Sequence, residues 1–151
     1  MTKISLDDIK KLREQTGAGV MDCRRALEEA KGDLPKAEKI LQKQGLAKAE
    51  KKSERETKAG LVSSYVHLTG RIGVLVALGC ETDFVARTGD FQKLAHELCL
   101  QVASMKPKNV KALLAQEYIR DPQMTIKDLV KQMIGKLGEN IRVVEFERVD
   151  I

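Results

Sequence analysis

The apolar run from Ile72 to Leu78, in the middle of the chain, constrains the fold more than any other segment. Nearly every position in it is apolar, so the strand that it predicts has two apolar faces. Leu61–Val66 predicts a preceding strand, and Leu68–Arg71 contains the glycine of a connecting turn. We therefore expect an antiparallel hairpin whose second strand, ending at Cys80, lies in the centre of a sheet with a cover on each face.

The residues after this hairpin predict helices and one more strand. Apolar residues at helical spacing run from Phe91 to Met105, and shorter helical patterns follow before and after a capping signal at Thr125. Ile141–Val149 alternates in part and predicts a last strand. Its alternation assigns four residues to one face, namely Arg142, Val144, Phe146 and Arg148. The predicted fold class for this part is α+β, a three-stranded antiparallel sheet packed with helices.

The first 45 residues predict a separate module of three short helices. Ser5 with acids after it is a helix start, the glycines of Thr16–Gly19 allow a tight turn, and Asp33 is the cap of a third helix. We expect Gly45 to end that helix. A bundle this small buries too little to form a catalytic domain, so a docking module is the better hypothesis.

A charged stretch separates the two predicted units. Between residues 46 and 59 both signs of charge are mixed and no apolar stripe is present, which is typical of a solvated linker, either helical or flexible. The predicted division is therefore a docking module at 1–45, a linker at 46–59 and a core domain at 60–151.

The net charge of +5 raises the question of nucleic acid, but the charge is spread thinly. Residues 1–45, 46–60 and 61–151 carry an excess of only two, two and one basic residues, whereas phosphate binding needs a concentrated stripe. No apolar run approaches the roughly 20 residues that span a bilayer, and the N-terminus is not that of a secretory signal. We expect a cytoplasmic protein without direct nucleic-acid or membrane binding.

No motif predicts a cofactor, a metal ion or an active site. The sequence lacks the glycine patterns of nucleotide cradles and the serine motif of hydrolases. Cys23, Cys80 and Cys99 are widely spaced and odd in number, which favours buried free thiols over a metal site. A binding or regulatory protein is thus favoured over an enzyme.

The segment from Cys80 to Arg87 holds the most informative group of side chains. Glu81, Thr82, Asp83 and Phe84 directly follow the central strand, where loops often carry function. Two interpretations stay open. Thr82 or Asp83 can be a helix cap with Phe84 in the core, or the ring and the carboxylate can be presented to a partner.

Three motifs together resemble the bacterial elongation factor Ts family, in the same order along nearly the whole chain. They are Thr16–Leu27, Cys80–Arg87 and Ile134–Arg142. The resemblance implies guanine-nucleotide exchange on elongation factor Tu. It also implies that the N-terminal helices are similar to a ubiquitin-associated domain.

The resemblance further assigns roles to two groups of residues. Docking on the GTPase domain of elongation factor Tu falls to Leu12, Arg13, Val20 and Met21. For Leu12 and Val20, packing inside the small bundle is an equal alternative. Displacement of magnesium and phosphate contacts in the partner falls to Thr82, Asp83, Phe84 and Val85.

The chain departs from the longest members of this family, which carry a second copy of the core and a C-terminal extension. Only one hairpin-and-helix unit is visible here. A homodimer or a linker that folds back are two ways to cover the second face of the central strand. The rival functions are a basic RNA-binding protein of translation and a ubiquitin-associated adaptor without exchange activity.

Overall fold

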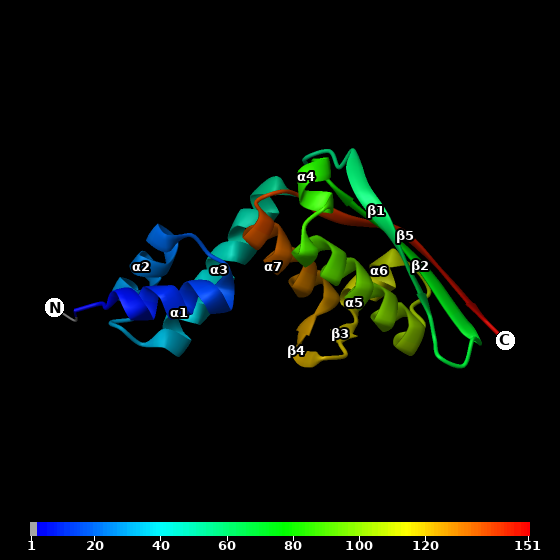
Figure 1. The fold of residues 1–151 in the computed structure, drawn as a ribbon, viewed down its shortest axis with the longest axis horizontal. Helices are drawn as coiled ribbons and strands as arrows, with labels where there is room; N and C mark the ends of the chain where they lie inside the picture. Colours follow the sequence, from blue (N-terminus) through cyan, green and yellow to red (C-terminus); the bar gives the residue numbers. More distant parts are fainter. Residues whose placement is uncertain (1–2) are drawn as a thin grey trace.

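The computed structural model describes residues 3–151, and Figure 1 shows two units at opposite ends of the long axis. The helices are α1 (Leu6–Thr16), α2 (Val20–Glu29), α3 (Leu34–Lys52), α4 (Asp83–Ala86), α5 (Gly89–Met105), α6 (Val110–Ala115) and α7 (Ile126–Leu137). The strands are β1 (Ala59–Val66), β2 (Ile72–Cys80), β3 (Glu117–Tyr118), β4 (Asp121–Thr125) and β5 (Ile141–Asp150). The predicted α+β architecture, with helices first and then a sheet packed with helices, is confirmed.

The N-terminal bundle consists of α1, α2 and the first half of α3. Its start and turn signals act as the sequence predicts: Ser5 accepts a hydrogen bond from the Asp8 N–H, and Asp33 accepts one from the Lys36 N–H. Gly17 ends α1 in the left-handed conformation, with φ of 67°. The bundle has its own apolar core, whose larger members are Leu12, Leu27 and Leu41. The likeness of this bundle to a ubiquitin-associated domain stays a prediction.

The predicted end of the third helix at Gly45 is wrong, because α3 continues to Lys52. The charged stretch is helical over this part, and Ala49 packs into the core of the second unit. Tertiary packing overrides the weak helix preference of glycine, since Gly45 lies against Gly135 of α7. The division of the chain into functional domains at residues 45 and 60 stays a prediction.

The contact between α3 and α7 joins the two units. A Cβ atom added at Gly135 would lie 2.9 Å from the Cα atom of Gly45, so the two helix backbones approach as closely as glycine allows. Polar contacts extend the joint along both helices: Lys131 pairs with Glu50, and the Lys52 ammonium donates to the carbonyl of Gly138. Helix α3 is therefore a rigid connection between the bundle and the sheet unit.

The main sheet has the strand order β1-β2-β5 and is antiparallel throughout, so the central position predicted for β2 is confirmed. Helices α5, α6 and α7 lie on one face of this sheet (Figure 1). Val74, Val76 and Leu78 point into that core. Within residues 3–151, no helix covers the second face, and Leu75 is half-exposed there. A cover by a second copy of the chain stays a prediction.

A β-bulge corrects the predicted alternation of the last strand. Ala77 pairs with Glu145 and Leu78 pairs with Val143, so Val144 is an extra residue between them. Beyond the bulge the inward face changes from odd to even positions. Val144 is exposed on the open face, whereas the Arg148 guanidinium reaches the Ala103 carbonyl of α5. The four residues assigned to one face therefore lie on both.

The two-stranded hairpin of β3 and β4 was not predicted from the sequence. A buried glutamate on α5 fixes it, since Glu97 accepts hydrogen bonds from the Tyr118 hydroxyl and the Arg120 guanidinium. Burial alone raises the pKa of the Glu97 carboxyl, but these two donors outweigh it and hold the pKa below its usual value. Short strands with few apolar residues leave almost no periodic signal.

The close contact of α3 with α7 leads to opposite effects for two helical glycines. Gly135→Ala is expected to destabilise the chain by about 1–3 kcal/mol, because its Cβ would meet the backbone of Gly45. Gly45→Ala is expected to stabilise it by about 0.5–1 kcal/mol, because no atom lies within 4 Å of its added Cβ and alanine favours the helix. Urea unfolding of both variants measures the difference, and equal shifts would contradict the packing at this joint.

Candidate functional site

The segment after β2 forms a short helical turn that is fastened at both ends. The Thr82 hydroxyl caps α4 and accepts a 3.5 Å hydrogen bond from the Val85 N–H. At the other end, the Thr88 hydroxyl donates to the Val85 carbonyl at 2.7 Å and accepts from the Phe91 N–H at 3.2 Å. These bonds hold the turn in one conformation relative to β2 and α5.

The ring of Phe84 projects from this fastened turn into solvent, with 85% of its surface exposed. Of the two interpretations of this segment, the cap at Thr82 is confirmed and the burial of Phe84 is wrong. Asp83 is exposed beside the ring. Val85 is nearly buried and belongs to the apolar core, so its side chain anchors the turn from within. The structure therefore directs Asp83 and Phe84 outward and Thr82 and Val85 inward.

Three side chains from the end of α7 and the end of β2 hold the base of this turn. Both carboxylate oxygens of Glu139 accept from Thr82, one from its N–H at 2.9 Å and one from its hydroxyl at 2.7 Å. Glu81 accepts from the Asn140 N–H at 2.8 Å. Sequence reasoning assigned no role to Glu139 or Asn140, because 57 or more residues separate them from their partners.

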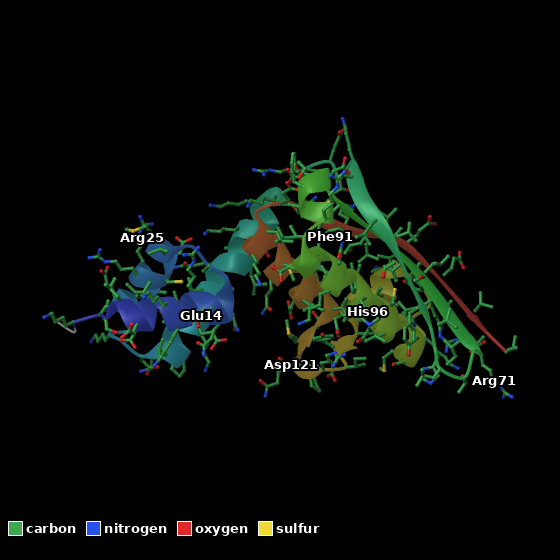
Figure 2. The ribbon with its side chains drawn as sticks, in the orientation of Figure 1. Glu14, Arg25, Arg71, Phe91, His96 and Asp121 are labelled. Carbon is green, nitrogen blue, oxygen red and sulfur yellow. The ribbon has the colours of Figure 1, made fainter. Side chains whose placement is uncertain are left out.

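The predicted docking residues lie where α1 meets α2. Arg13 is exposed, and Val20 and Met21 are 47% and 57% exposed at the start of α2. Leu12 is fully buried in the core of the bundle, so it supports this face without forming part of its surface. Figure 2 shows Arg25 further along α2, at the surface of the same bundle. The docking role of the exposed residues stays a prediction.

The glycine turn of the first motif has a packing role that its sequence did not reveal. A Cβ at Gly17 would lie 2.5 Å from the Lys136 side chain of α7. The turn thus faces the second unit across a cleft of about 360 Å³, which α3 and α7 also line. The motif therefore forms the turn between α1 and α2 and also places that turn against α7 of the second unit.

The three cysteines are buried and free, as the sequence predicts. Burial raises the pKa of the Cys80 thiol, with a further rise from the charge of Glu139, so it stays protonated and donates to the Thr82 carbonyl. Over residues 3–151, no group of three or more histidine, cysteine or acidic side chains gathers as a metal site would require. Within the same range, no helix is long and apolar enough to cross a membrane.

The second half of the chain matches a known family. Residues 81–151, which include the capped turn and its supporting glutamates, match the model of the family described as elongation factor TS. The chain is also 43% identical to elongation factor Ts of Thermotoga neapolitana, and the match covers 99% of this chain and 98% of the relative. The chain belongs to the elongation factor Ts family. The resemblance that the three motifs indicated is thereby confirmed.

Other elongation factor Ts proteins match over a similar length. Those of Thermotoga maritima and Fervidobacterium nodosum are 44% and 42% identical, over 99% of this chain and 96% and 98% of their own. The aligned stretches span 192 and 194 positions, more than the 151 residues of this chain. These elongation factor Ts relatives therefore contain internal residues that this chain lacks. Membership of the family makes the chain an elongation factor of protein biosynthesis.

The exposure of Phe84 predicts a large difference between two phenylalanines. Phe84→Ala is expected to change the free energy of unfolding by no more than about 0.5 kcal/mol, as is usual for an exposed side chain. Phe91, fully buried on α5 (Figure 2), is expected to cost about 3–5 kcal/mol when it is replaced by alanine. Urea unfolding distinguishes them, and a loss of several kcal/mol for Phe84→Ala would place its ring in the core.

Proposed function

We propose that this chain is a guanine-nucleotide exchange factor that binds elongation factor Tu and promotes release of GDP. The observation that carries the proposal is the exposed ring of Phe84 on a turn that is capped at both ends. An apolar ring that a hydrogen-bonded turn carries into solvent contributes nothing to the stability of the fold by itself. Its burial in a partner would be favourable, and we assign elongation factor Tu as that partner because the chain belongs to the elongation factor Ts family.

The exchange step follows from differential binding. A factor that binds nucleotide-free elongation factor Tu more tightly than its GDP complex must weaken GDP binding by the same factor. In our proposal the Phe84 ring enters between side chains that hold the magnesium ion and the phosphates of the partner. Loss of magnesium then exposes the charge of the diphosphate and favours its release.

The four residues of the turn have different roles in this proposal. Phe84 and Asp83 are exposed and form the contact with elongation factor Tu. Thr82 caps the turn, and Val85 fixes it to the core. No reacting atom belongs to this chain in the proposal, so it acts as an exchange factor and not as an enzyme.

Docking is assigned to the exposed face of the N-terminal bundle. Arg13, Val20 and Met21 bind the GTPase domain of elongation factor Tu, with Leu12 beneath them. Because α3 joins this bundle to α7, docking and insertion of the ring are carried out by one connected body. The proposal includes no contact with nucleic acid.

Release of labelled GDP from elongation factor Tu tests the function directly. A substoichiometric amount of this protein is expected to accelerate release by orders of magnitude. The matched control is Phe84→Ala, which is expected to fold and to accelerate release poorly. Release at the spontaneous rate, with binding confirmed by calorimetry, would contradict the exchange function and favour a simple adaptor.

We also propose that a second copy of the chain covers the open face of the sheet. Five apolar side chains on this face are between 49% and 67% exposed: Val62, Val66, Leu75, Val144 and Val149. The linker does not fold back over them as a helix, because α3 packs on α7, and Thr57 reaches only the corner at Gly79. An apolar patch that spans three strands is typical of an interface.

The oligomeric state tests this second proposal. Light scattering is expected to give twice the chain mass of 16.8 kDa, and Leu75→Glu, at the centre of the face, is expected to give a monomer with an unchanged α+β circular dichroism spectrum. Lys127→Glu on the helical side is the control and is expected to remain dimeric. A monomeric native chain at high micromolar concentration would contradict the proposal.

A further inference from the structure

The turn that carries Phe84 depends on a polar cluster formed by Glu81, Glu139 and Asn140. Glu81 directly follows β2, and the other two residues lie between α7 and β5. None of the three belongs to the docking face or to the exposed part of the turn. Their hydrogen bonds nevertheless connect three segments of the chain at one place, residues 53–55, 81–82 and 139–140.

The first set of hydrogen bonds fixes Thr82, the residue at the start of the turn. Glu139 is a bidentate acceptor for the N–H and the hydroxyl of Thr82. The Thr82 hydroxyl donates its hydrogen to Glu139, and its oxygen still accepts from the Val85 N–H. The hydrogen bond to Glu139 and the cap of α4 therefore use the same oxygen atom. A shift of Glu139 would therefore disturb the cap two residues before the Phe84 ring.

The second connection runs from the same place to the N-terminal bundle. The Asn140 side chain is 2% exposed, and its amide donates to the carbonyls of Ser53 and Arg55 at 3.3 and 2.7 Å. These two residues directly follow α3, the helix that comes from the docking bundle. The Arg55 guanidinium also lies 3.6 Å from Glu81, which in turn accepts from the Asn140 N–H.

From these contacts we infer that Glu139, with Glu81 and Asn140, positions the Phe84 ring relative to the docking bundle and thereby sets the rate of GDP release. The inference rests on the proposed exchange function. Glu139 is a positioning residue, since it acts through Thr82 and touches no partner. Its contribution lies in the length of a side chain that reaches both polar groups of Thr82, and not in its charge.

Three substitutions at position 139 separate geometry from charge. Glu139→Gln keeps the length of the side chain: its amide oxygen accepts from the Thr82 N–H, and its amide nitrogen donates to the hydroxyl oxygen. Glu139→Asp keeps the charge but is one methylene too short to reach Thr82. Glu139→Ala removes both properties. The expected order of exchange activity is therefore native, then Gln, with Asp and Ala well below.

The measurement is GDP release from elongation factor Tu at increasing concentrations of this protein until the rate saturates. The saturating rate is expected to fall about tenfold or more for Glu139→Asp and Glu139→Ala, because small displacements of a positioned group have large kinetic effects. It is expected to stay within about threefold of native for Glu139→Gln. A partly unfolded variant would instead need more protein for half-saturation and reach the native saturating rate.

Glu97→Ala is the matched control. Glu97 is likewise a carboxylate that accepts from two donors in the same unit, and it is more buried than Glu139, but its partners Tyr118 and Arg120 belong to the hairpin of β3 and β4. This variant is expected to lose stability in urea and to keep the native saturating rate. A native saturating rate for both Glu139→Asp and Glu139→Ala would overturn the inference, and so would a lower rate for Gln than for Asp.

A second readout does not depend on elongation factor Tu. The chain has no tryptophan, so Phe84→Trp introduces a single tryptophan at the position of the ring, which can be excited apart from the two tyrosines. The amplitude of the fast local component in its anisotropy decay is expected to rise when Glu139→Asp is added, because motion of the turn is then added to rotation of the exposed ring. Adding Glu97→Ala is expected to leave the decay unchanged. A decay that Glu139→Asp does not alter would show that the hydrogen bonds of Glu139 do not restrain the turn that carries the ring.

The two readouts distinguish failure of the inference from failure of the proposed function. If the native chain does not accelerate GDP release, the exchange function is wrong, and the anisotropy alone decides whether Glu139 positions the ring. If the native chain accelerates release and the Asp and Ala variants both do so equally well at saturation, the function stands and the positioning role is wrong.

Discussion

The packing of α3 against α7 at Gly45 and Gly135 determines how this molecule is assembled. The helices can approach this closely because Gly135 has no Cβ: one added there would lie 2.9 Å from the Cα atom of Gly45, whereas one added at Gly45 would meet no atom within 4 Å. Because α3 begins in the N-terminal bundle and ends beside the sheet unit, this contact makes one body of two small cores. The bundle alone would bury too little apolar surface to be a robust unit.

The polar cluster around Asn140 completes this assembly at the other end of α3. A buried amide that bonds two carbonyls just beyond a helix satisfies groups that would otherwise lose water without compensation. Glu81 and Glu139 extend the same cluster to the Phe84 turn. In the proposed function, a partner bound to the bundle is connected to the Phe84 ring, which enters its nucleotide site. The connection runs through α3 and a few hydrogen bonds.

Much of the local structure could be predicted because its causes lie within a few residues of each other. Caps at Ser5, Asp33 and Thr125, the hairpin of β1 and β2, and the helical stripe beginning at Phe91 are short-range patterns, and all are confirmed. The motif at Cys80–Arg87 likewise located the turn, but two interpretations of Phe84 were equally compatible with its residues. Its exposure depends on what α5 and α7 leave uncovered.

The sequence by itself determined the kinds of elements, their order, the central place of β2 and the family, since periodicity, caps and motifs are properties of neighbouring residues. Only the tertiary structure decided that α3 continues through Gly45, that Val144 forms a bulge and that Glu139 holds Thr82. In each case the deciding partner lies far away in the chain. Contacts of this kind leave no periodic signal, so no local pattern could reveal them.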